Sequence, residues 1–211
     1  MKIAVTILAA GGSTRMGDLN KLLLLIDDKP MIYSVCRMVL DARVNQIILV
    51  TGHQNNEVEK SIPKGIHKIV YNKDWENGMM SSIYAGMSKL EKDVDGNMIV
   101  LGDMPLISTM TINKIIGEFN KHDGNHIVYP IYGDRQANPV IFPRKYFPEI
   151  LNSKGDKGCK KVLKKYPGNS VGIHINSDEV IIDCDTRDDY FLIEKKLINN
   201  VQTYRVIPNN S

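Results

Sequence analysis

The sequence has few cysteines, and their spacing does not suit a disulfide or zinc framework. There are three, Cys36, Cys159 and Cys184, and none belongs to a C-x-x-C pair. Small secreted domains and structural zinc sites carry paired cysteines at short spacings. Both classes are therefore excluded, and the cysteine content indicates a reducing compartment, which we expect to be the cytoplasm.

Long apolar runs and a strong charge imbalance are also missing. No apolar stretch approaches the roughly 20 residues of a membrane-spanning helix, so we expect no membrane association. The formal net charge is only +3 and no arginine cluster forms a basic arm, which argues against nucleic acid as a partner. Lys2 and the apolar run Ile3–Leu8 resemble the start of a signal peptide. However, the run is at the short end for one and reads equally well as a strand.

Apolar strands alternate with amphipathic stretches along most of the 211 residues, 43% of which are hydrophobic. Strands are predicted at 3–8, 46–52, 66–71, 97–101 and 180–183, and two more flank a Gly-Asp turn within 127–142. Helical spacing predicts helices near 31–42 and 108–122. Such alternation is typical of a parallel sheet covered on both faces. We expect an α/β fold, a Rossmann-like three-layer sandwich with a mostly parallel central sheet. It would form one domain over residues 1–198, followed by a loosely specified tail over 199–211.

A glycine-containing turn directly after the first predicted strand is the most informative stretch. Small residues there allow a ligand to approach the backbone, and successive N–H groups form a concave site for phosphate oxygens. Two cations follow at its mouth, and ligands of parallel sheets bind at the carboxyl ends of strands. The residues that we expect to contact the phosphates are Leu8, Ala9, Ala10, Gly11, Gly12, Arg15 and Lys21.

Two better-known phosphate loops do not match this turn. A Walker A loop needs Lys-Ser or Lys-Thr directly after its last glycine. Gly12 and Gly17 have the spacing of such a loop, but Gly17 is followed by Asp18 and Leu19. The G-x-G-x-x-G fingerprint of dinucleotide-binding folds is absent from the turn as well. The stretch therefore favours a phosphate site of another kind, with an ordinary scaffold turn as the alternative.

The strongest chemical signal is a single carboxylate at the end of a predicted strand. Apolar residues from Met98 to Leu101 lead to Gly102, Asp103 and then Pro105. Mg²⁺ is bound by one or two carboxylates together with substrate phosphates. The alternative is that Asp103 caps the following helix, but Ser108 or Thr109 is better placed for that. We therefore expect Asp103 to bind Mg²⁺.

Several of these motifs together resemble one family. Leu8-Ala-Ala-Gly, Arg15-Met16-Gly17, Lys21-Leu22-Leu23 and Gly102-Asp-Met-Pro105 are similar to the signature of the nucleotidyltransferases that attach a nucleotide to molybdopterin. Nearly the whole chain is covered by this resemblance. It implies the fold expected above, Mg²⁺ as cofactor, and catalytic roles for Arg15, Lys21 and Asp103.

The same resemblance assigns further residues to nucleotide and metal. Gly78 and Ser82 match the segment that lies over base or ribose, although Ser81 or Ser82 could simply cap a helix. Thr51, at the end of the second predicted strand, is assigned to the nucleotide as well. Asp185 matches the second metal ligand. Asp183 remains its rival, because alternate residues of a strand point the same way.

The acceptor side of the site matches the family less well. The family usually has Gly-His before a Pro-Val pair, whereas Ala137 and Asn138 stand here, and Arg187 replaces a proline. Asn138 can still form hydrogen bonds and is kept as an acceptor-binding residue. Asp156, Lys157 and Lys160 lie in a matching Gly-Asp-Lys-Gly turn and the helix after it. For the lysines the alternative is a solvated cationic helix face.

The resemblance implies a transfer of CMP from CTP to the phosphate of molybdopterin or molybdenum cofactor, with release of pyrophosphate. CTP is favoured over GTP because Leu8-Ala-Ala-Gly is closer to the cytidylyltransferase form of the motif. A molybdenum hydroxylase such as xanthine dehydrogenase is the implied protein partner. Three alternatives stay open: the guanylyltransferase of the same pathway, transfer to another phosphorylated acceptor, and a non-catalytic carrier of nucleotide or cofactor.

Overall fold

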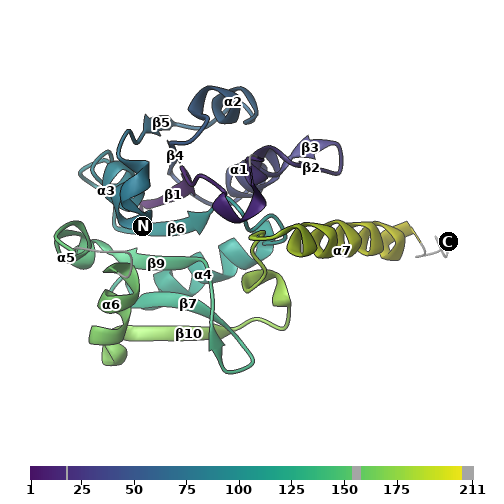
Figure 1. Ribbon diagram of the computed structural model, residues 1–211. Coiled ribbons are helices and arrows are strands. Elements are labelled where there is room, and N and C mark those ends of the chain that lie inside the picture. The colour runs from purple at the N-terminus through teal and green to yellow at the C-terminus, as the bar shows by residue number, and fades with distance from the viewer. Residues whose placement is uncertain (18, 154–157, 206–211) are drawn as a thin grey trace.

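One central sheet organises the chain (Figure 1). The computed structural model describes residues 1–17, 19–153 and 158–205. Along the sheet the strands run in the order β10-β7-β9-β6-β1-β4-β5, with the short β8 paired to β7. A separate two-stranded hairpin, β2-β3, precedes the first helix. Among the described residues no helix is both long and apolar enough to cross a membrane.

The elements have the following bounds. The sheet strands are β1 (Ile3–Ala9), β4 (Gln46–Thr51), β5 (Lys68–Tyr71), β6 (Gly96–Leu101), β7 (Ile127–Tyr132), β8 (Arg135–Gln136), β9 (Val140–Pro143) and β10 (Ser170–His174). The hairpin strands are β2 (Leu25–Ile26) and β3 (Lys29–Pro30). The helices are α1 (Met31–Leu40), α2 (Asn55–Lys60), α3 (Met79–Met87), α4 (Thr109–Lys121), α5 (Phe147–Leu151), α6 (Gly158–Lys165) and α7 (Arg187–Arg205).

Helices cover both faces of the sheet. One apolar cluster joins β1, β4 and β6 to α1, α2 and α4, and includes the fully buried Val35, Ile112 and Phe119. A second cluster joins β6, β7 and β9 to α3, α5 and α6 through residues such as Ile83 and Phe142. Strands buried on both faces are continuous apolar runs, as all six buried residues of β4 illustrate. The expected three-layer α/β sandwich is confirmed.

The sheet is mostly parallel, as expected. β1 pairs in parallel with both β4 and β6, and β10 pairs in parallel with β7. β9 runs antiparallel to β6 and β7, and the short β8 runs antiparallel to β7. The predicted Gly-Asp turn within 127–142 joins β7 to β8 at Gly133 and Asp134.

The predicted strand at 180–183 is wrong. A 3-10 turn covers Asp178–Val180, and no strand is assigned from there to α7. The apolar residues are buried by side-chain packing instead, Val180 against Ala137 and Ile175, and Cys184 in a cluster with Ile26. The apolar residues of this segment therefore pack at the edge of the core and do not pair as a strand.

α7 is the last element that the structure describes, and it extends away from the body of the molecule (Figure 1). It continues to Arg205, past residue 199, where the tail was expected to begin. The segment before it, which carries Asp183 and Asp185, lies at the same edge of the sheet as the glycine-containing turn.

Candidate active site

A pocket of about 480 Å³ lies at the carboxyl ends of β1 and β6. The turn after β1 forms one wall, and Trp75 with the start of α3 forms another. The third wall comes from Asp103, after β6, and from Asp183 and Asp185, before α7. Four segments far apart in the sequence therefore meet where parallel sheets bind their ligands.

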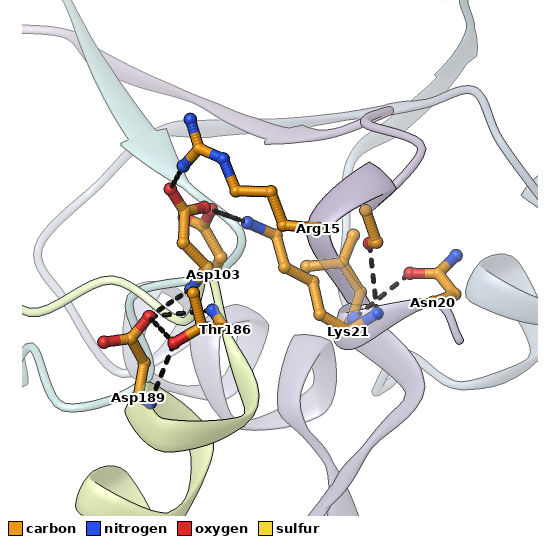
Figure 2. A network of polar contacts seen from close by, with 9 residues as sticks. Arg15, Asn20, Lys21, Asp103, Thr186 and Asp189 are labelled. Carbon is orange, nitrogen blue, oxygen red and sulfur yellow. Dashed lines mark hydrogen bonds and ion pairs between the residues drawn. The ribbon is translucent and has the colours of Figure 1, made fainter. Parts of the chain in front are cut away.

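The turn after β1 is held by hydrogen bonds of its own side chains. Ser13 adopts a left-handed conformation with φ of 53°, and its Oγ accepts a bond of 3.1 Å from the backbone N–H of Lys21. Asn20 Oδ1 accepts a bond of 3.1 Å from the N–H of Leu22. These bonds fold the chain back, so that Arg15 and Lys21 emerge on the same side of the pocket (Figure 2).

Lys21 lies between two carboxylates. Its Nζ is 2.6 Å from Asp103 Oδ2 and 2.8 Å from Asp185 Oδ1, and Arg15 pairs with the other oxygen of Asp185. The side chains of Lys21 and Asp103 are only 13% and 18% exposed. The Lys21–Asp103 ion pair is thus partly shielded from water, which strengthens it relative to exposed pairs.

The charges of this cluster shift the titration of its members. Burial alone would lower the pKa of Lys21, but Asp103 and Asp185 outweigh burial, and the pKa is raised above its ordinary value. Lys21 therefore carries its charge throughout the neutral range. Burial, together with the charges of Asp103 and Asp185, raises the pKa of Asp183 above the usual aspartate value.

One backbone bond ties the two carboxylate segments together. The N–H of Cys184 donates a bond of 2.9 Å to the carbonyl oxygen of Asp103. Cys184 is fully buried, packed with Met31 and Ile193. Asp185 is therefore fixed relative to Asp103, although 82 residues separate the two in the sequence.

A capping box at the start of α7 fixes the position of Asp185 further. Asp189 Oδ2 accepts bonds from the backbone N–H groups of Asp185 and Thr186, at 3.1 and 2.7 Å, and from Thr186 Oγ1 at 2.7 Å. In return Thr186 Oγ1 accepts a bond of 3.2 Å from the N–H of Asp189. Figure 2 shows this pair beside the ionic cluster. Thr186 and Asp189 therefore cap α7, and the cap anchors the carboxylate before it.

We expect Asp189→Ala to lower the free energy of unfolding by about 1 kcal/mol at neutral pH, because it removes this cap. Asp188→Ala, which removes the same charge from the same helix turn, is the matched control and should cost clearly less.

The contribution of Asp189 to stability should depend on pH. Burial would raise the pKa of Asp189, but the bonds from Thr186 and Asp185 outweigh it, and the pKa is lowered. The cap therefore stabilises above the ordinary aspartate pKa and is lost as the pH falls through the lowered value. Denaturant unfolding at neutral and acid pH should show the difference between wild type and Asp189→Ala shrinking in acid. A constant difference would contradict the assignment.

Trp75 packs directly on the glycine-containing turn. A Cβ atom on Gly12 would lie 2.8 Å from Cζ3 of the indole, so only glycine lets the ring approach this closely. Behind the indole, a Cβ on Gly52 would lie 2.7 Å from Trp75 Cβ and 2.6 Å from the carbonyl oxygen of Ala10. The ring of His53 lies 5.3 Å from the indole. Trp75 is therefore held on both sides and shapes this wall of the pocket.

We expect Gly52→Ala to disturb the pocket from outside it, because the new methyl group must displace Ala10 or Trp75. Forcing extra volume into such a contact costs about 1–3 kcal/mol. The variant should unfold at lower denaturant and show a raised KM for nucleotide. Gly117→Ala is the control, since a Cβ there meets nothing within 4 Å and alanine is the better helix former. An unchanged KM in Gly52→Ala would show that the Trp75 wall is not needed for binding.

The donor set fits a divalent metal that is shared with substrate phosphates. Asp103 Oδ1 is buried and has no hydrogen-bond partner among the described residues, and such an atom is costly unless a ligand satisfies it. The described residues hold no cluster of three or more His, Cys, Asp or Glu that could bind a metal alone. Asp103 and Asp185 can supply two oxygen ligands, which is the usual protein share of a Mg²⁺ site.

Most of the predicted site residues meet in this pocket. Those that line it are Leu8, Ala10, Gly11, Gly12, Arg15, Lys21, Gly78, Ser82, Asp103 and Asp185. The rival carboxylate Asp183 lines it too. Ser82 is nearly buried and accepts a bond of 3.0 Å from Asn72, which fixes the first turn of α3 over the pocket.

Two predicted nucleotide contacts do not lie on the pocket surface. Among the described residues that line the pocket, neither Ala9 nor Thr51 is found. The two are partners across β1 and β4 and are fully buried. Successive residues of a strand point to opposite faces, so Ala9 lies in the core on the α1 side. Thr51 Oγ1 donates to Glu59 instead.

Of the predicted acceptor-binding residues, only Asn138 has a described side chain. Asn138 lies outside the pocket lining among the described residues, and its backbone N–H donates to the carbonyl oxygen of Val180. Asp156 and Lys157 lie outside the described residues. Lys160 is on α6, but its side chain is not described.

Sequence reasoning passed over several residues of the pocket. Ser13 lines the pocket and, together with Asn20 beside it, fixes the turn. An Asn before an apolar run is a recognisable cap signal. Glu76, beside Trp75, also lines the pocket. Nothing in its local sequence distinguishes it from an ordinary exposed glutamate.

Comparisons with known proteins agree with this geometry. The model of the MobA-like NTP transferase domain matches residues 5–171. The chain is 26% identical to 2-C-methyl-D-erythritol 4-phosphate cytidylyltransferase of Lachnoclostridium phytofermentans, covering 94% of this chain and 89% of that one. It is 25% identical to molybdenum cofactor cytidylyltransferase of Escherichia coli, at 90% and 94% coverage. It is also 32% identical to a probable molybdenum cofactor guanylyltransferase of Pyrococcus horikoshii, at 77% and 80% coverage.

Solved structures show the same fold. Rv0371c from Mycobacterium tuberculosis superimposes with a TM-score of 0.81 at 24% identity, covering 92% of this chain and 98% of that one. Its manganese complex superimposes with a TM-score of 0.79 at 25% identity, at 92% and 99% coverage. The chain therefore belongs to the MobA-like NTP transferase family and is a nucleotidyltransferase.

Proposed function

We propose that the protein transfers CMP from CTP to the phosphate of molybdopterin or molybdenum cofactor and releases pyrophosphate. One observation carries the proposal: the turn after β1, with Arg15 and Lys21, faces Asp103 and Asp185 across a single pocket. The pocket thereby brings together two cations that can neutralise the charge of phosphates and two carboxylates that can bind a divalent metal.

The chemistry needs positioning and charge neutralisation more than covalent help. A phosphate of the acceptor is already ionised, so it can attack the α-phosphate of the nucleotide without a general base. Lys21 and Arg15 would stabilise negative charge on the leaving pyrophosphate, in the partly shielded pocket where such contacts are strongest. The turn from Ala10 to Gly12 would offer backbone N–H groups to phosphate oxygens.

Asp103 and Asp185 would hold Mg²⁺. Bound together with the nucleotide, the metal would neutralise charge on the phosphate oxygens and polarise them. The buried, unpaired Oδ1 of Asp103 supports this role, and the manganese complex of Rv0371c supports a divalent metal in this fold.

The choice of CTP and of a molybdopterin acceptor is based on the sequence and on the relatives. Leu8-Ala-Ala-Gly favours CTP, and two of the relatives are named as cytidylyltransferases. Asn138, Asp156, Lys157 and Lys160 would bind the acceptor. A molybdenum hydroxylase, for example xanthine dehydrogenase, would receive the product.

A second candidate keeps the nucleotide and changes the acceptor. The relative from Lachnoclostridium is named for 2-C-methyl-D-erythritol 4-phosphate, and the match to it covers 94% of the chain. That acceptor, like molybdopterin, presents a phosphate to the nucleotide. The same ionic cluster would serve both reactions, and the acceptor side of the pocket would select between them.

Pyrophosphate release tests both candidates. The assay combines Mg²⁺ with CTP, GTP, ATP or UTP, and with molybdopterin, molybdenum cofactor, 2-C-methyl-D-erythritol 4-phosphate or a sugar 1-phosphate. We expect release with CTP and a molybdopterin acceptor. A preference for GTP would keep the mechanism and overturn the assigned base, and turnover with another acceptor would replace the proposal by the second candidate. Nucleotide binding without release for any acceptor would favour a carrier.

A further inference from the structure

Lys21 contacts both carboxylates that would hold the divalent metal. Its ammonium group lies 2.6 Å from an oxygen of Asp103 and 2.8 Å from an oxygen of Asp185. These distances are those of charge-assisted hydrogen bonds. The same oxygens cannot all be given to a metal ion while the ammonium group keeps both bonds.

The charges of the cluster also oppose the binding of a free metal ion while Lys21 is in place. Arg15 and Lys21 face the three aspartates of the pocket, Asp103, Asp183 and Asp185, so the formal charge of these five side chains is −1. Without Lys21 it would be −2, which a divalent cation would balance. A metal that bound only to the free Oδ1 of Asp103 would lie next to the ammonium group, and the two positive charges would repel each other in a partly buried site.

A polyphosphate removes this conflict, because its oxygens can pair with Lys21 while they also coordinate the metal. We propose that the Asp103–Asp185 pair takes a divalent metal as its polyphosphate complex and not as the free ion, with Lys21 occupying the carboxylates until phosphate oxygens draw it away. The inference rests on the proposed function only in that the pocket receives a nucleoside triphosphate.

Lys21 is better suited to this exchange than Arg15. Its backbone is fixed by Ser13 Oγ, while its flexible side chain carries a compact charge that can change partners. Its side chain is 13% exposed, whereas that of Arg15 is 70% exposed. The Lys21 pair is therefore the one that a metal must displace in order to reach Asp103.

Metal binding to the protein without nucleotide or acceptor tests the proposal. Mn²⁺ is titrated into wild type, Lys21→Met and Lys21→Arg, and free Mn²⁺ is measured by electron paramagnetic resonance. We expect Lys21→Met to bind Mn²⁺ tighter than wild type by on the order of tenfold, and Lys21→Arg to show no gain. Lys114→Met, on the exposed face of α4, is the control for loss of a positive charge. The added Asp103→Asn substitution should abolish the gain.

A second measurement needs no variant. Equilibrium dialysis compares the binding of Mn²⁺, of inorganic tripolyphosphate and of their complex to wild type, and the complex should bind at least about tenfold tighter than either component alone. Wild type that binds free Mn²⁺ as tightly as Lys21→Met, or as tightly as the complex, would overturn the proposal. Because neither experiment uses CTP or an acceptor, a wrong substrate assignment leaves the result intact. Conversely, if wild type turned over CTP and also bound free Mn²⁺ tightly, the proposal about metal binding would be wrong and the proposed function would stand.

Discussion

Asp103→Asn is expected to reduce turnover by about 10²–10³-fold, the usual cost of losing one charge-stabilising group from a phosphate or oxyanion site. The amide keeps the volume of the side chain but cannot serve as an anionic metal ligand. It also leaves Lys21 paired with Asp185 alone. The measurement is kcat for pyrophosphate release at saturating nucleotide, over a range of Mg²⁺ concentrations. We expect kcat to stay low even at high Mg²⁺.

Asp134→Asn provides the comparison for this variant, because Asp134 is an exposed residue of the turn between β7 and β8. It should keep wild-type turnover. Thermal unfolding of both variants separates a lost site from a lost fold. If Asp103→Asn kept more than a tenth of the wild-type kcat, the metal would have to be held elsewhere, and Asp183 with Asp185 would become the next pair to test.

Lys21→Met is the second variant with a large expected effect. It should lower kcat/KM for the nucleotide by about 10²–10³-fold, because the leaving pyrophosphate loses a cation in a partly shielded site. The same substitution should tighten the binding of free metal. One change is therefore expected to move two readouts in opposite directions, which a general disturbance of the pocket would not do.

Lys21→Arg separates the charge of this residue from its shape. Arginine keeps the positive charge but presents a planar, wider group, so part of the activity should return while the distance to Asp103 is no longer ideal. Kinetics of wild type, Lys21→Met and Lys21→Arg at one saturating Mg²⁺ concentration give the comparison. Wild-type kcat/KM in Lys21→Met would remove Lys21 from the reaction altogether.

The parts of the site that depend on local sequence could be predicted. The strand and turn from Ile3 to Gly12 have the composition of a buried strand followed by a close backbone approach. Asp103 lies two residues after a strand, and Thr186 is followed by an acidic residue three positions later. Each of these signals is contained within a dozen residues, and each structure forms there.

The parts that depend on distant contacts could not. Val180 to Asp183 has the composition of a strand, but Val180 and Cys184 are buried by two separate clusters, and the backbone N–H of Cys184 is used by Asp103. The direction of β9 and the ion pairs of Lys21 are likewise set by residues far away in the sequence. For Ala9 and Thr51 the strands were predicted correctly, but which face of the sheet borders the pocket was not.

Trp75 has a consequence for how the protein can be observed. It is the single tryptophan of the chain, and its indole is half-buried against Gly12 in the wall of the pocket. All tryptophan emission therefore originates at one place, next to the turn expected to receive the phosphates. Its intensity and wavelength give a label-free optical signal in which the arrival of metal, polyphosphate and nucleotide can be followed one at a time and in either order.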